Sequence, residues 1–364
     1  MAQRNASKIC IVLSSLSNGG TERFGAMLSK ILTNLGHDVH IVITHDAVEY
    51  DFDGTLFNLE KQTKTKQGVI SKLMALNQYF KRHNFDVVID NRLRTVFFKE
   101  LIMHRLFFKG SKIIAMVHNH KVENYFPVNN FVSKLIYSNS TTFIGVSKKI
   151  KERVKEDYDF KKVIHIYNPI NSKEIQARGN AVKNPLGYDY ILYFGRFEEV
   201  AKNLSLLIKS YDLSGLTTRG VKLVLMGKGD DKNRIMQLVA QRGLSQDVVF
   251  MDYQPEPFLF VKHALFTVLT SNYEGFPMSI IESLACGTPV VSVDCPSGPG
   301  EVVINDMNGK LVENHNAKAL ANAFVDLLNN PILYKTCKDN AASSVKHLDT
   351  SVIANEWKET LQRV

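Results

Sequence analysis

The segment 273–293, YEGFPMSIIESLACGTPVVSV, limits the possible folds of this chain more than any other. It begins with a carboxylate in a Gly/Pro loop, Glu274, and continues as an apolar helical pattern that Pro277 opens and Gly287 ends. A strand-like run follows at 289–293. This order of loop, helix, glycine turn and buried strand is typical of a parallel α/β sheet, which binds ligands at the carboxyl ends of its strands.

Glu282 lies eight residues after Glu274 and interrupts the apolar pattern of the helix. A helical glutamate is usually exposed to solvent, and two glutamates eight residues apart are common by chance. The GFP loop before the helix and the ACGTPVV exit after it favour the other interpretation. We therefore expect both carboxylates to belong to a ligand site.

Strand-like and helical patterns alternate along the whole chain, which predicts an α/β fold with helices on both faces of parallel sheets. In the first half we expect strands at 8–14, 39–44, 86–90, 112–118, 142–146 and 163–166, and helices at 21–35, 68–81, 95–107, 128–137 and 147–156. In the second half we expect strands at 190–195, 222–226, 248–251, 266–269 and 289–293, and helices at 204–211, 230–242, 257–264 and 278–286.

A chain of 364 residues suits two domains. The polar stretch 168–188 contains two Pro and two Gly and is interpreted as the connection between them. The predicted divisions are a Rossmann-like domain, a linker, a second Rossmann-like domain and a terminal helix, at 1–170, 171–187, 188–345 and 346–364.

The charge is concentrated in the first half of the chain. Residues 1–185 hold 28 Lys and Arg against 16 Asp and Glu, whereas 186–364 hold 17 against 20. This asymmetry indicates an anionic partner, either nucleic acid or an anionic membrane. The four cysteines have no metal or disulfide spacing, and we find neither a signal peptide nor a transmembrane run, so we expect a cytoplasmic protein, soluble or peripheral on a membrane.

The segment 94–112, RTVFFKELIMHRLFFKGSK, interleaves apolar and basic residues. One interpretation is a scaffold helix that buries Phe97, Leu101 and Phe108. The other is an amphipathic helix that lies in a membrane interface, which would account for the basic first half.

Three further segments follow expected strands and are candidates for ligand binding. Gly19 and Gly20 lie between a strand and a helix, where the backbone can approach an anion. Arg196 and Lys202 leave the first strand of the second domain, and this pair of charges suits a diphosphate without a metal. His118 ends an apolar strand, where a histidine either makes structural hydrogen bonds or has a functional role.

Weaker candidates lie at the ends of other expected strands. Arg92, Arg94 and Asn119 could line an acceptor site. Gly227, Lys228 and Tyr253 could shape a nucleotide pocket, or could belong to ordinary turns. We expect no metal site, because His118 and His120 have no accompanying carboxylate or cysteine cluster.

The segment EGFPMSIIESLACGTPVVSVDCPSGPGEVV resembles the E-x7-E region of retaining family-4 glycosyltransferases, which have the GT-B fold. The resemblance is closest to the bacterial lipopolysaccharide, capsule and O-antigen branch. The GGTER turn and the GR…KN pattern are similar as well. The resemblance implies two Rossmann-like doubly wound domains facing a cleft, with a C-terminal helix that crosses back to the first domain.

The resemblance also implies roles for the candidate residues. Glu274 and His118 would contact the donor sugar at the reacting centre, and Glu282 would hold the ribose hydroxyls. The diphosphate would be bound by Arg196, Lys202, Gly19 and Gly20, and the loop that binds sugar or phosphate would be Gly275, Phe276, Pro277 and Met278. The leaving diphosphate would deprotonate the acceptor in a front-face mechanism.

The implied activity is transfer of a hexose or N-acetylhexosamine from a UDP-sugar to a hydroxyl of a lipid-linked glycan. The acceptor would be carried by a polyprenyl diphosphate at the inner face of the membrane, and neither a metal nor a cofactor is expected. An alternative within the fold is a sugar-nucleotide epimerase. A basic nucleic-acid-binding protein is an alternative of another class, although the chain has no helix-turn-helix, zinc-finger or ribonucleoprotein motif.

Overall fold

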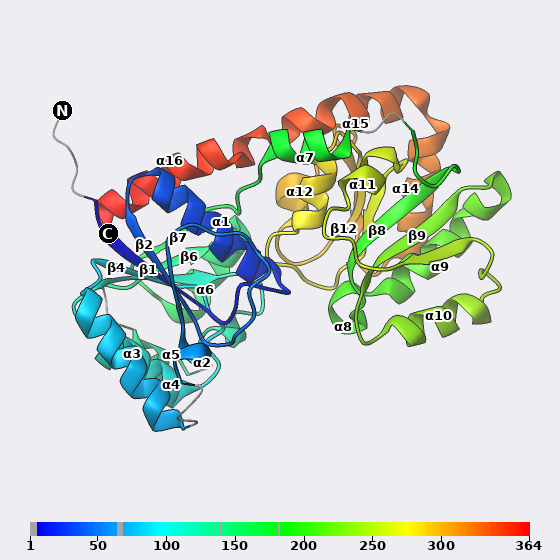
Figure 1. The fold of residues 1–364 in the computed structure, drawn as a ribbon. Coiled ribbons are helices and arrows are strands. Elements are labelled where there is room, and N and C mark those ends of the chain that lie inside the picture. Colours follow the sequence, from blue (N-terminus) through cyan, green and yellow to red (C-terminus); the bar gives the residue numbers. More distant parts are fainter. Residues whose placement is uncertain (1–5, 64–67, 128, 138–139, 181–182) are drawn as a thin grey trace. The chain divides into compact units, whose positions relative to one another are not determined.

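The computed structural model describes residues 6–63, 68–127, 129–137, 140–180 and 183–364. The chain divides into two compact units, each with its own parallel sheet (Figure 1). Unit 1 runs to Pro169 and also contains Thr350–Val364, and unit 2 is Ile170–Asp349. The prediction of two Rossmann-like α/β sheets is confirmed.

The described strands of unit 1 form a seven-stranded parallel sheet in the order β3-β2-β1-β4-β5-β6-β7. The strands are β1 (Lys8–Leu13), β2 (Asp38–Ile43), β3 (Thr55–Asn58), β4 (Val87–Asp90), β5 (Lys112–Val117), β6 (Thr142–Gly145) and β7 (Val163–His165). Most are almost continuous runs of buried apolar residues, because helices cover both faces of the sheet. The strand order reverses between β1 and β4, so the loops that leave these two strands meet at a topological switch point.

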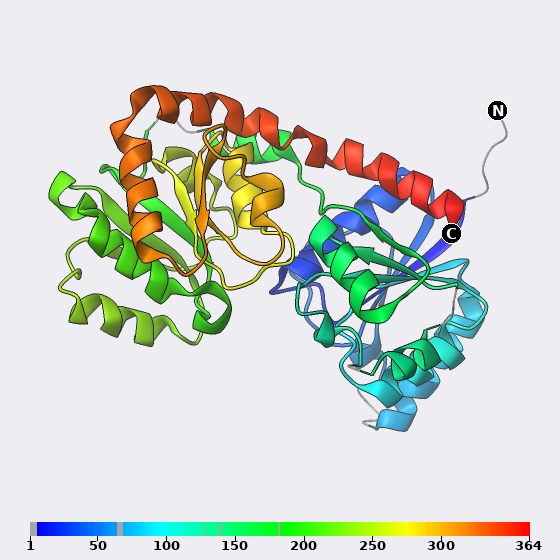
Figure 2. The same cartoon turned by 180° about the vertical axis from the view of Figure 1, so that it is seen from behind.

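Helices lie on both faces of this sheet (Figures 1 and 2). On one face, α1 (Gly20–Asn34) contacts the C-terminal helix α16 (Thr350–Arg363), where the fully buried Trp357 ring lies 6.4 Å from the ring of Phe24. The remaining helices are α2 (Leu59–Gln62), α3 (Val69–His83), α4 (Phe97–Ile102), the π-helix η1 (Met103–Phe107), the 3-10 turn η2 (Val122–Asn124), α5 (Asn130–Ile136) and α6 (Lys148–Tyr158). As the resemblance implied, the C-terminal helix returns to the N-terminal sheet.

The described part of unit 2 contains a six-stranded parallel sheet in the order β10-β9-β8-β11-β12-β13. Its strands are β8 (Tyr190–Arg196), β9 (Lys222–Lys228), β10 (Val248–Met251), β11 (Thr267–Leu269), β12 (Val290–Asp294) and β13 (Gly309–Glu313). Its helices are α7 (Ser172–Gly179), α8 (Glu199–Lys202), α9 (Leu204–Ser214), η3 (Leu216–Arg219), α10 (Lys232–Gln241), α11 (Phe258–His263), α12 (Met278–Ala285), α13 (Pro299–Val302), α14 (Ala317–Asn329), α15 (Pro331–Ser344) and η4 (Lys346–Leu348). The switch point lies between β8 and β11.

The structure differs from the expected elements in several places. The stretch 171–187, expected to be a linker, contains α7, which packs on α11 and α12 of unit 2. The expected helix at 95–107 is an α-helix that continues as the π-helix η1. The short strands β3 and β13 were not expected. In the part of the chain that the structure describes, no helix combines the length and apolarity needed to cross a bilayer.

Candidate functional site

The two loops at the switch point of unit 2 are fastened to each other by hydrogen bonds. The backbone N–H of Asn272 donates to the Ala201 carbonyl at 2.8 Å, and the Thr270 hydroxyl donates to the Lys202 carbonyl at 2.9 Å. The Asn203 amide donates to the Asn272 side chain at 3.1 Å. These contacts hold the segment after β8 against the segment after β11.

Lys202 and Glu274, both predicted site residues, meet at this junction. The Lys202 Nζ donates to Glu274 Oε1 at 2.6 Å, and their side chains are only 17% and 12% exposed. The Ser271 hydroxyl donates to the same oxygen at 2.6 Å and is fully buried. Charge-assisted hydrogen bonds from two donors fix the Glu274 carboxylate at the carboxyl edge of the sheet, where ligands bind in α/β folds.

The loop that carries Glu274 is supported by the SGPGE segment that follows β12. The Glu274 N–H donates to the Pro296 carbonyl at 3.1 Å, and the Ser297 hydroxyl donates to the Gly275 carbonyl at 2.8 Å. Gly298 has φ 99°, and a Cβ on it would lie 2.3 Å from Cδ of Pro277. Only glycine fits there without moving the loop. Phe276 and Pro277 are buried in the same loop, so its shape depends on packing as well as on hydrogen bonds.

Glu282 and Arg196 differ in how the structure places them. Glu282 is 5% exposed in the middle of α12, whose first residue, Met278, follows the GFP loop. The Arg196 side chain is 68% exposed and pairs with Glu198 at 3.1 Å. Arg196 therefore lies at the carboxyl end of β8 as expected but is not joined to the Lys202–Glu274 pair.

The weaker nucleotide-pocket candidates lie at the neighbouring ends of β9 and β10. A Cβ on Gly227 would lie 1.8 Å from the Gly195 carbonyl oxygen, so glycine allows the two strand ends to approach closely. The Lys228 Nζ lies 4.8 Å from the centre of the Tyr253 ring, which is a cation–π contact. Tyr253 is 47% exposed and presents an aromatic surface beside this charge.

In unit 1, Asn91 joins three of the loops at the carboxyl edge of the sheet. Its Nδ2 donates to the Thr21 carbonyl at 2.8 Å, which leaves Oδ1 to accept from Nε2 of His118 at 2.6 Å. Thr21 lies in the first turn of α1, directly after Gly19 and Gly20. The predicted glycine turn and His118 are therefore brought together, and Asn91 fixes the tautomer of the imidazole.

His118 is electrically neutral in this environment. Burial, followed by the nearby Arg94 guanidinium, lowers the pKa of His118 to about 3. A neutral imidazole with Nε2–H used by Asn91 keeps Nδ1 unprotonated, so it can accept a hydrogen bond but cannot act as an acid. The neighbouring Asn119 caps its own turn, since its Oδ1 accepts from the Lys121 N–H at 2.9 Å.

Arg92 and Arg94, expected on an acceptor surface, are structural. Arg92 is 2% exposed, and its guanidinium donates to Asp90 at 2.8 and 2.9 Å and to Glu100 at 2.8 Å. Arg94 is 1% exposed and donates to carbonyl groups, including that of Met116 at 2.9 Å. Both arginines follow β4, as the sequence predicted. Both guanidinium groups are buried, however, and therefore cannot contact an acceptor.

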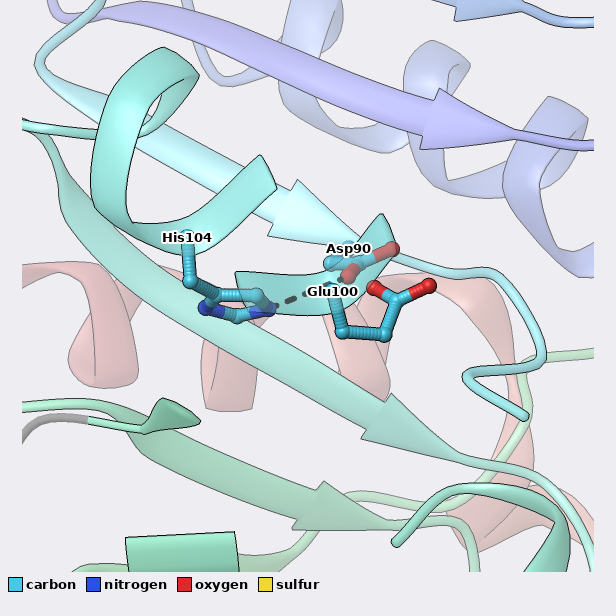
Figure 3. Close-up of side chains that lie close together, drawn as sticks. All are labelled: Asp90, Glu100 and His104. Atoms are coloured by element: carbon cyan, nitrogen blue, oxygen red, sulfur yellow. Dashed lines mark ion pairs between the residues drawn. The ribbon is translucent and has the colours of Figure 1, made fainter. Parts of the chain in front are cut away.

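Asp90, Glu100 and His104 form the one cluster of possible metal ligands in the described residues (Figure 3). Their candidate ligand atoms lie within 4.8 Å of one another. Arg92 already bridges both carboxylates and supplies the positive charge that a metal would bring. We therefore assign this cluster to the scaffold, where it ties α4 and η1 to the end of β4.

The electrostatics of the cluster agree with this assignment. Burial raises the pKa of Asp90, but Arg92, His104 and Arg94 together outweigh burial and hold the pKa of that carboxyl well below its usual range. Burial raises the pKa of Glu100, and Arg92 only partly opposes it. Burial also lowers the pKa of His104, which stays neutral 3.5 Å from Asp90. The anionic Asp90 is thus matched by an internal cation.

Comparison with protein families identifies the class of the protein. Residues 18–174 match the family described as "Glycosyltransferase Family 4", and residues 175–344 match "Glycosyl transferases group 1". Together these models span nearly the whole chain. The chain belongs to the family-4 glycosyltransferases, which have the GT-B fold.

Similar proteins act in bacterial glycan synthesis. The chain is 28% identical to the "N-acetylgalactosamine-N,N'-diacetylbacillosaminyl-diphospho-undecaprenol 4-alpha-N-acetylgalactosaminyltransferase" of Campylobacter jejuni, over 96% of this chain and 98% of that protein. It is 21% identical to the "Amylovoran biosynthesis glycosyltransferase AmsD" of Erwinia amylovora, over 97% and 99%.

Solved structures share the fold over the whole length. A mutant of TarM from S. aureus, solved with UDP, superposes with TM-score 0.79 at 16% identity, covering 97% of this chain and 99% of that one. Anabaena HepE in complex with UDP gives TM-score 0.77 at 17% identity, covering 98% and 100%. At these identities the likeness establishes the GT-B fold.

The sequence did not indicate the contacts of three residues that organise the site. Ser271 and Asn203 are short polar residues in loops, and such residues are common in turns without any function. Asn91 directly follows its strand, but nothing in the sequence indicates that it bonds His118, which is 27 residues away. These contacts are long-range in sequence, and spacing alone does not reveal them.

Proposed function

We propose that this protein is a retaining glycosyltransferase that moves a hexose or N-acetylhexosamine from a UDP-sugar to a hydroxyl of a lipid-linked glycan. The observation that carries the proposal is the Glu274 carboxylate, held by Lys202 and Ser271 at the switch point of unit 2. Glu274 is the first glutamate of the E-x7-E segment, and Glu282 is the second. The setting would be bacterial surface glycan assembly.

The names of similar proteins support the donor and the acceptor. The Campylobacter relative is named as acting on a diphospho-undecaprenol-linked sugar and as forming an α linkage. TarM and HepE have been solved with UDP. We extend these chemistries to this chain, so that the acceptor is carried by a polyprenyl diphosphate and the enzyme works on the inner face of the membrane.

The proposed roles of the residues follow from their chemistry. Lys202 and Arg196 neutralise the diphosphate as it leaves, which stabilises the transition state without a metal. Glu274 contacts the sugar hydroxyls and the developing positive charge, and Glu282 accepts from the ribose hydroxyls. His118 contacts the donor sugar, and its neutral ring accepts a hydrogen bond from a sugar hydroxyl. The leaving diphosphate takes the proton of the acceptor hydroxyl.

A binding panel and a product analysis test the proposal. Thermal stability is measured with UDP, GDP and ADP and their sugar conjugates, with and without EDTA. We expect UDP compounds alone to raise Tm, unchanged by EDTA, and Arg196→Ala to abolish the shift. Stabilisation only by GDP or ADP would show that the donor assignment is wrong, and loss of the shift in EDTA would overturn metal independence.

Transfer itself is followed as UDP release with a diphospho-polyprenyl glycan acceptor. Glu274→Gln should reduce the rate at least about a hundredfold, as expected for loss of a charged contact in the transition state. Glu313→Gln, an exposed glutamate at the end of β13, is the matched control and should be fully active. The anomeric configuration of the product, read by NMR, distinguishes retention from inversion.

A further inference from the structure

Asn91 has a fixed place at the carboxyl edge of the unit 1 sheet. It directly follows β4, is 1% exposed, and donates its backbone N–H to the Val12 carbonyl of β1 at 3.0 Å. The loops that leave β1 and β4 meet here, at the switch point of the sheet. The position of the Asn91 amide is therefore set by the two central strands.

The two hydrogen bonds of the Asn91 amide have a fixed polarity. The Thr21 carbonyl can only accept a hydrogen bond, so Nδ2 of Asn91 must be the atom that faces it, at 2.8 Å. The Asn91 Oδ1 then faces Nε2 of His118 at 2.6 Å, and because this oxygen can only accept, Nε2 must carry the proton. A neutral imidazole of this form has its lone pair on Nδ1. A main-chain carbonyl of α1 thus decides which nitrogen of His118 can accept.

The neighbours of the imidazole hold its orientation and its charge. The Phe24 ring of α1 meets it edge-on, with the ring centres 4.9 Å apart and an angle of 64° between the planes. Arg94, which is 1% exposed, donates to the carbonyl of Met116, two residues before His118, at 2.9 Å. Burial and the Arg94 cation lower the pKa of His118. The ring is therefore a neutral group in one orientation.

We propose that Asn91 is a positioning residue of the transfer reaction, which holds Nδ1 of His118 as the acceptor of a hydrogen bond from the donor sugar. The sugar hydroxyl that meets Nδ1 must then be the donor of that bond. The same amide joins the imidazole to the glycine turn, because Thr21 directly follows Gly20. Asn91 touches no reacting atom and acts through His118. The inference rests on the proposed function, since it takes the contact of His118 with the donor sugar as its starting point.

The tautomer of His118 is measured first, and this measurement does not depend on activity. NMR of protein with isotopically labelled histidine distinguishes a protonated from an unprotonated ring nitrogen, and His118→Gln assigns the signal. We expect a protonated Nε2 and an unprotonated Nδ1 throughout about pH 5–8, the range in which an ordinary histidine titrates. A protonated Nδ1, or exchange between the two tautomers, would overturn the proposal.

Asn91→Asp should make the activity depend on pH. A carboxylate beside His118 raises the pKa of the imidazole, and a cationic ring has no lone pair on Nδ1. Relative to the unchanged protein, we expect kcat/KM of this variant to fall as the pH is lowered, by up to about tenfold per pH unit. His118→Gln in the same background should remove the fall. A pH profile parallel to that of the unchanged protein would contradict the role of Asn91.

The other ionisable groups around the imidazole cannot produce this result. Arg94 stays charged at every pH of the assay. Burial raises the pKa of Tyr125, whose hydroxyl bonds the main chain of His118, to about 12, so that hydroxyl stays neutral. Glu22 of α1, whose charge acts on Tyr125, is the same in every variant and cancels in the comparison.

A double-mutant cycle separates positioning from a purely structural role. Asn91→Ala should lower kcat/KM roughly tenfold or more, mainly through kcat, because the imidazole is no longer held for the transition state. In the His118→Gln background the same substitution should cost clearly less, and equal losses in both backgrounds would overturn the proposal. The matched control is Asn58→Ala, which should leave kcat/KM unchanged. Asn58 is also buried at the end of a unit 1 strand and uses both amide atoms, toward Asp46 and the Lys61 N–H.

The thermal shift with UDP is measured on the same samples, because it reports the donor site of unit 2. If no nucleotide raises Tm and no transfer occurs, the proposed function fails, and the positioning role fails with it. If UDP raises Tm and transfer proceeds, but the Asn91→Asp profile matches that of the unchanged protein, only the positioning role is wrong.

Discussion

Replacing Ser271 by Ala tests whether the position of Glu274 is essential. The buried Ser271 hydroxyl and the Lys202 ammonium both donate to Glu274 Oε1 at 2.6 Å. A hydrogen bond to a charged group contributes about 1.5–3 kcal/mol. Because Lys202 still restrains the carboxylate, we expect Ser271→Ala to fall at the lower end of this range. That corresponds to a roughly tenfold loss in kcat/KM, since about 1.4 kcal/mol is a factor of ten.

A double-mutant cycle makes the prediction more specific. Lys202→Met removes the charged partner of a pair that is mostly buried, and about 3 kcal/mol or more should be lost, which is at least a hundredfold in kcat/KM. Once Lys202 is absent, Ser271 is the one of these two donors that still holds the carboxylate, so Ser271→Ala should cost more in the Lys202→Met background than it does alone. We expect a coupling energy of about 1 kcal/mol between the two substitutions.

The assay is the initial rate of UDP release at varied donor concentration. Ser271→Thr keeps a hydroxyl and should restore most of the activity, whereas a purely structural defect would not respond to it. Ser210→Ala, which removes a fully buried hydroxyl within α9, is the matched control and should leave kcat/KM unchanged. Full activity of Ser271→Ala, or strictly additive effects in the cycle, would refute the reasoning.

Three further outcomes are expected from the structure. Gly298→Ala should destabilise the loop by about 1–3 kcal/mol and reduce transfer, because the new Cβ would clash with Pro277 at a residue with positive φ. Gly187 also has positive φ, but a Cβ there meets no neighbour, so Gly187→Ala is the control and should leave transfer intact. Arg92→Met should lower the free energy of unfolding in urea by about 3–5 kcal/mol, because it strands two buried carboxylates. A small effect would show that the cluster is dispensable. The pKa of His118 is about 3 in the folded protein, which is below its unfolded value near 6.5. The neutral ring therefore contributes fully to the free energy of unfolding above pH 6.5. This contribution is lost as the pH falls toward 3, by at most about 1.4 kcal/mol per pH unit. His118→Gln should flatten that slope in urea unfolding, and an unchanged slope would contradict the assignment.

The sequence predicted the parallel sheets well, because their strands are dominated by apolar residues and are therefore read easily. The strands β3 and β13 were not predicted, because each is short and only partly buried along much of its length, and polar residues interrupt its apolar pattern. Helix α7 was not predicted for a different reason. Its segment is polar with nearby Gly and Pro, and its helical state depends on packing against α11 and α12.

Motifs in the sequence predicted which strand ends carry the candidate residues, but not the tertiary contacts among those residues. Glu274 and Lys202 were both expected near a ligand, but their direct pairing depends on the hydrogen bonds between the β8 and β11 loops. Arg92 and Arg94 show the opposite case. Their position after β4 indicated a surface role, yet Arg92 is buried because it forms ion pairs with the buried Asp90 and Glu100. Sequence spacing carries no information on such compensation of charge.

The chain leaves unit 1 at Pro169 and returns at Thr350, and these passages are adjacent within unit 2. The Ile170 N–H donates to the Leu348 carbonyl at 2.9 Å, and the Ser172 N–H donates to Asp349 at 3.2 Å. Unit 2 is thus an uninterrupted insertion between the two parts of unit 1, and α16 is synthesised after it. During translation the second unit can complete its fold before the first. The single tryptophan, Trp357, is buried where α16 packs on α1, so its fluorescence reports the docking of α16 onto unit 1.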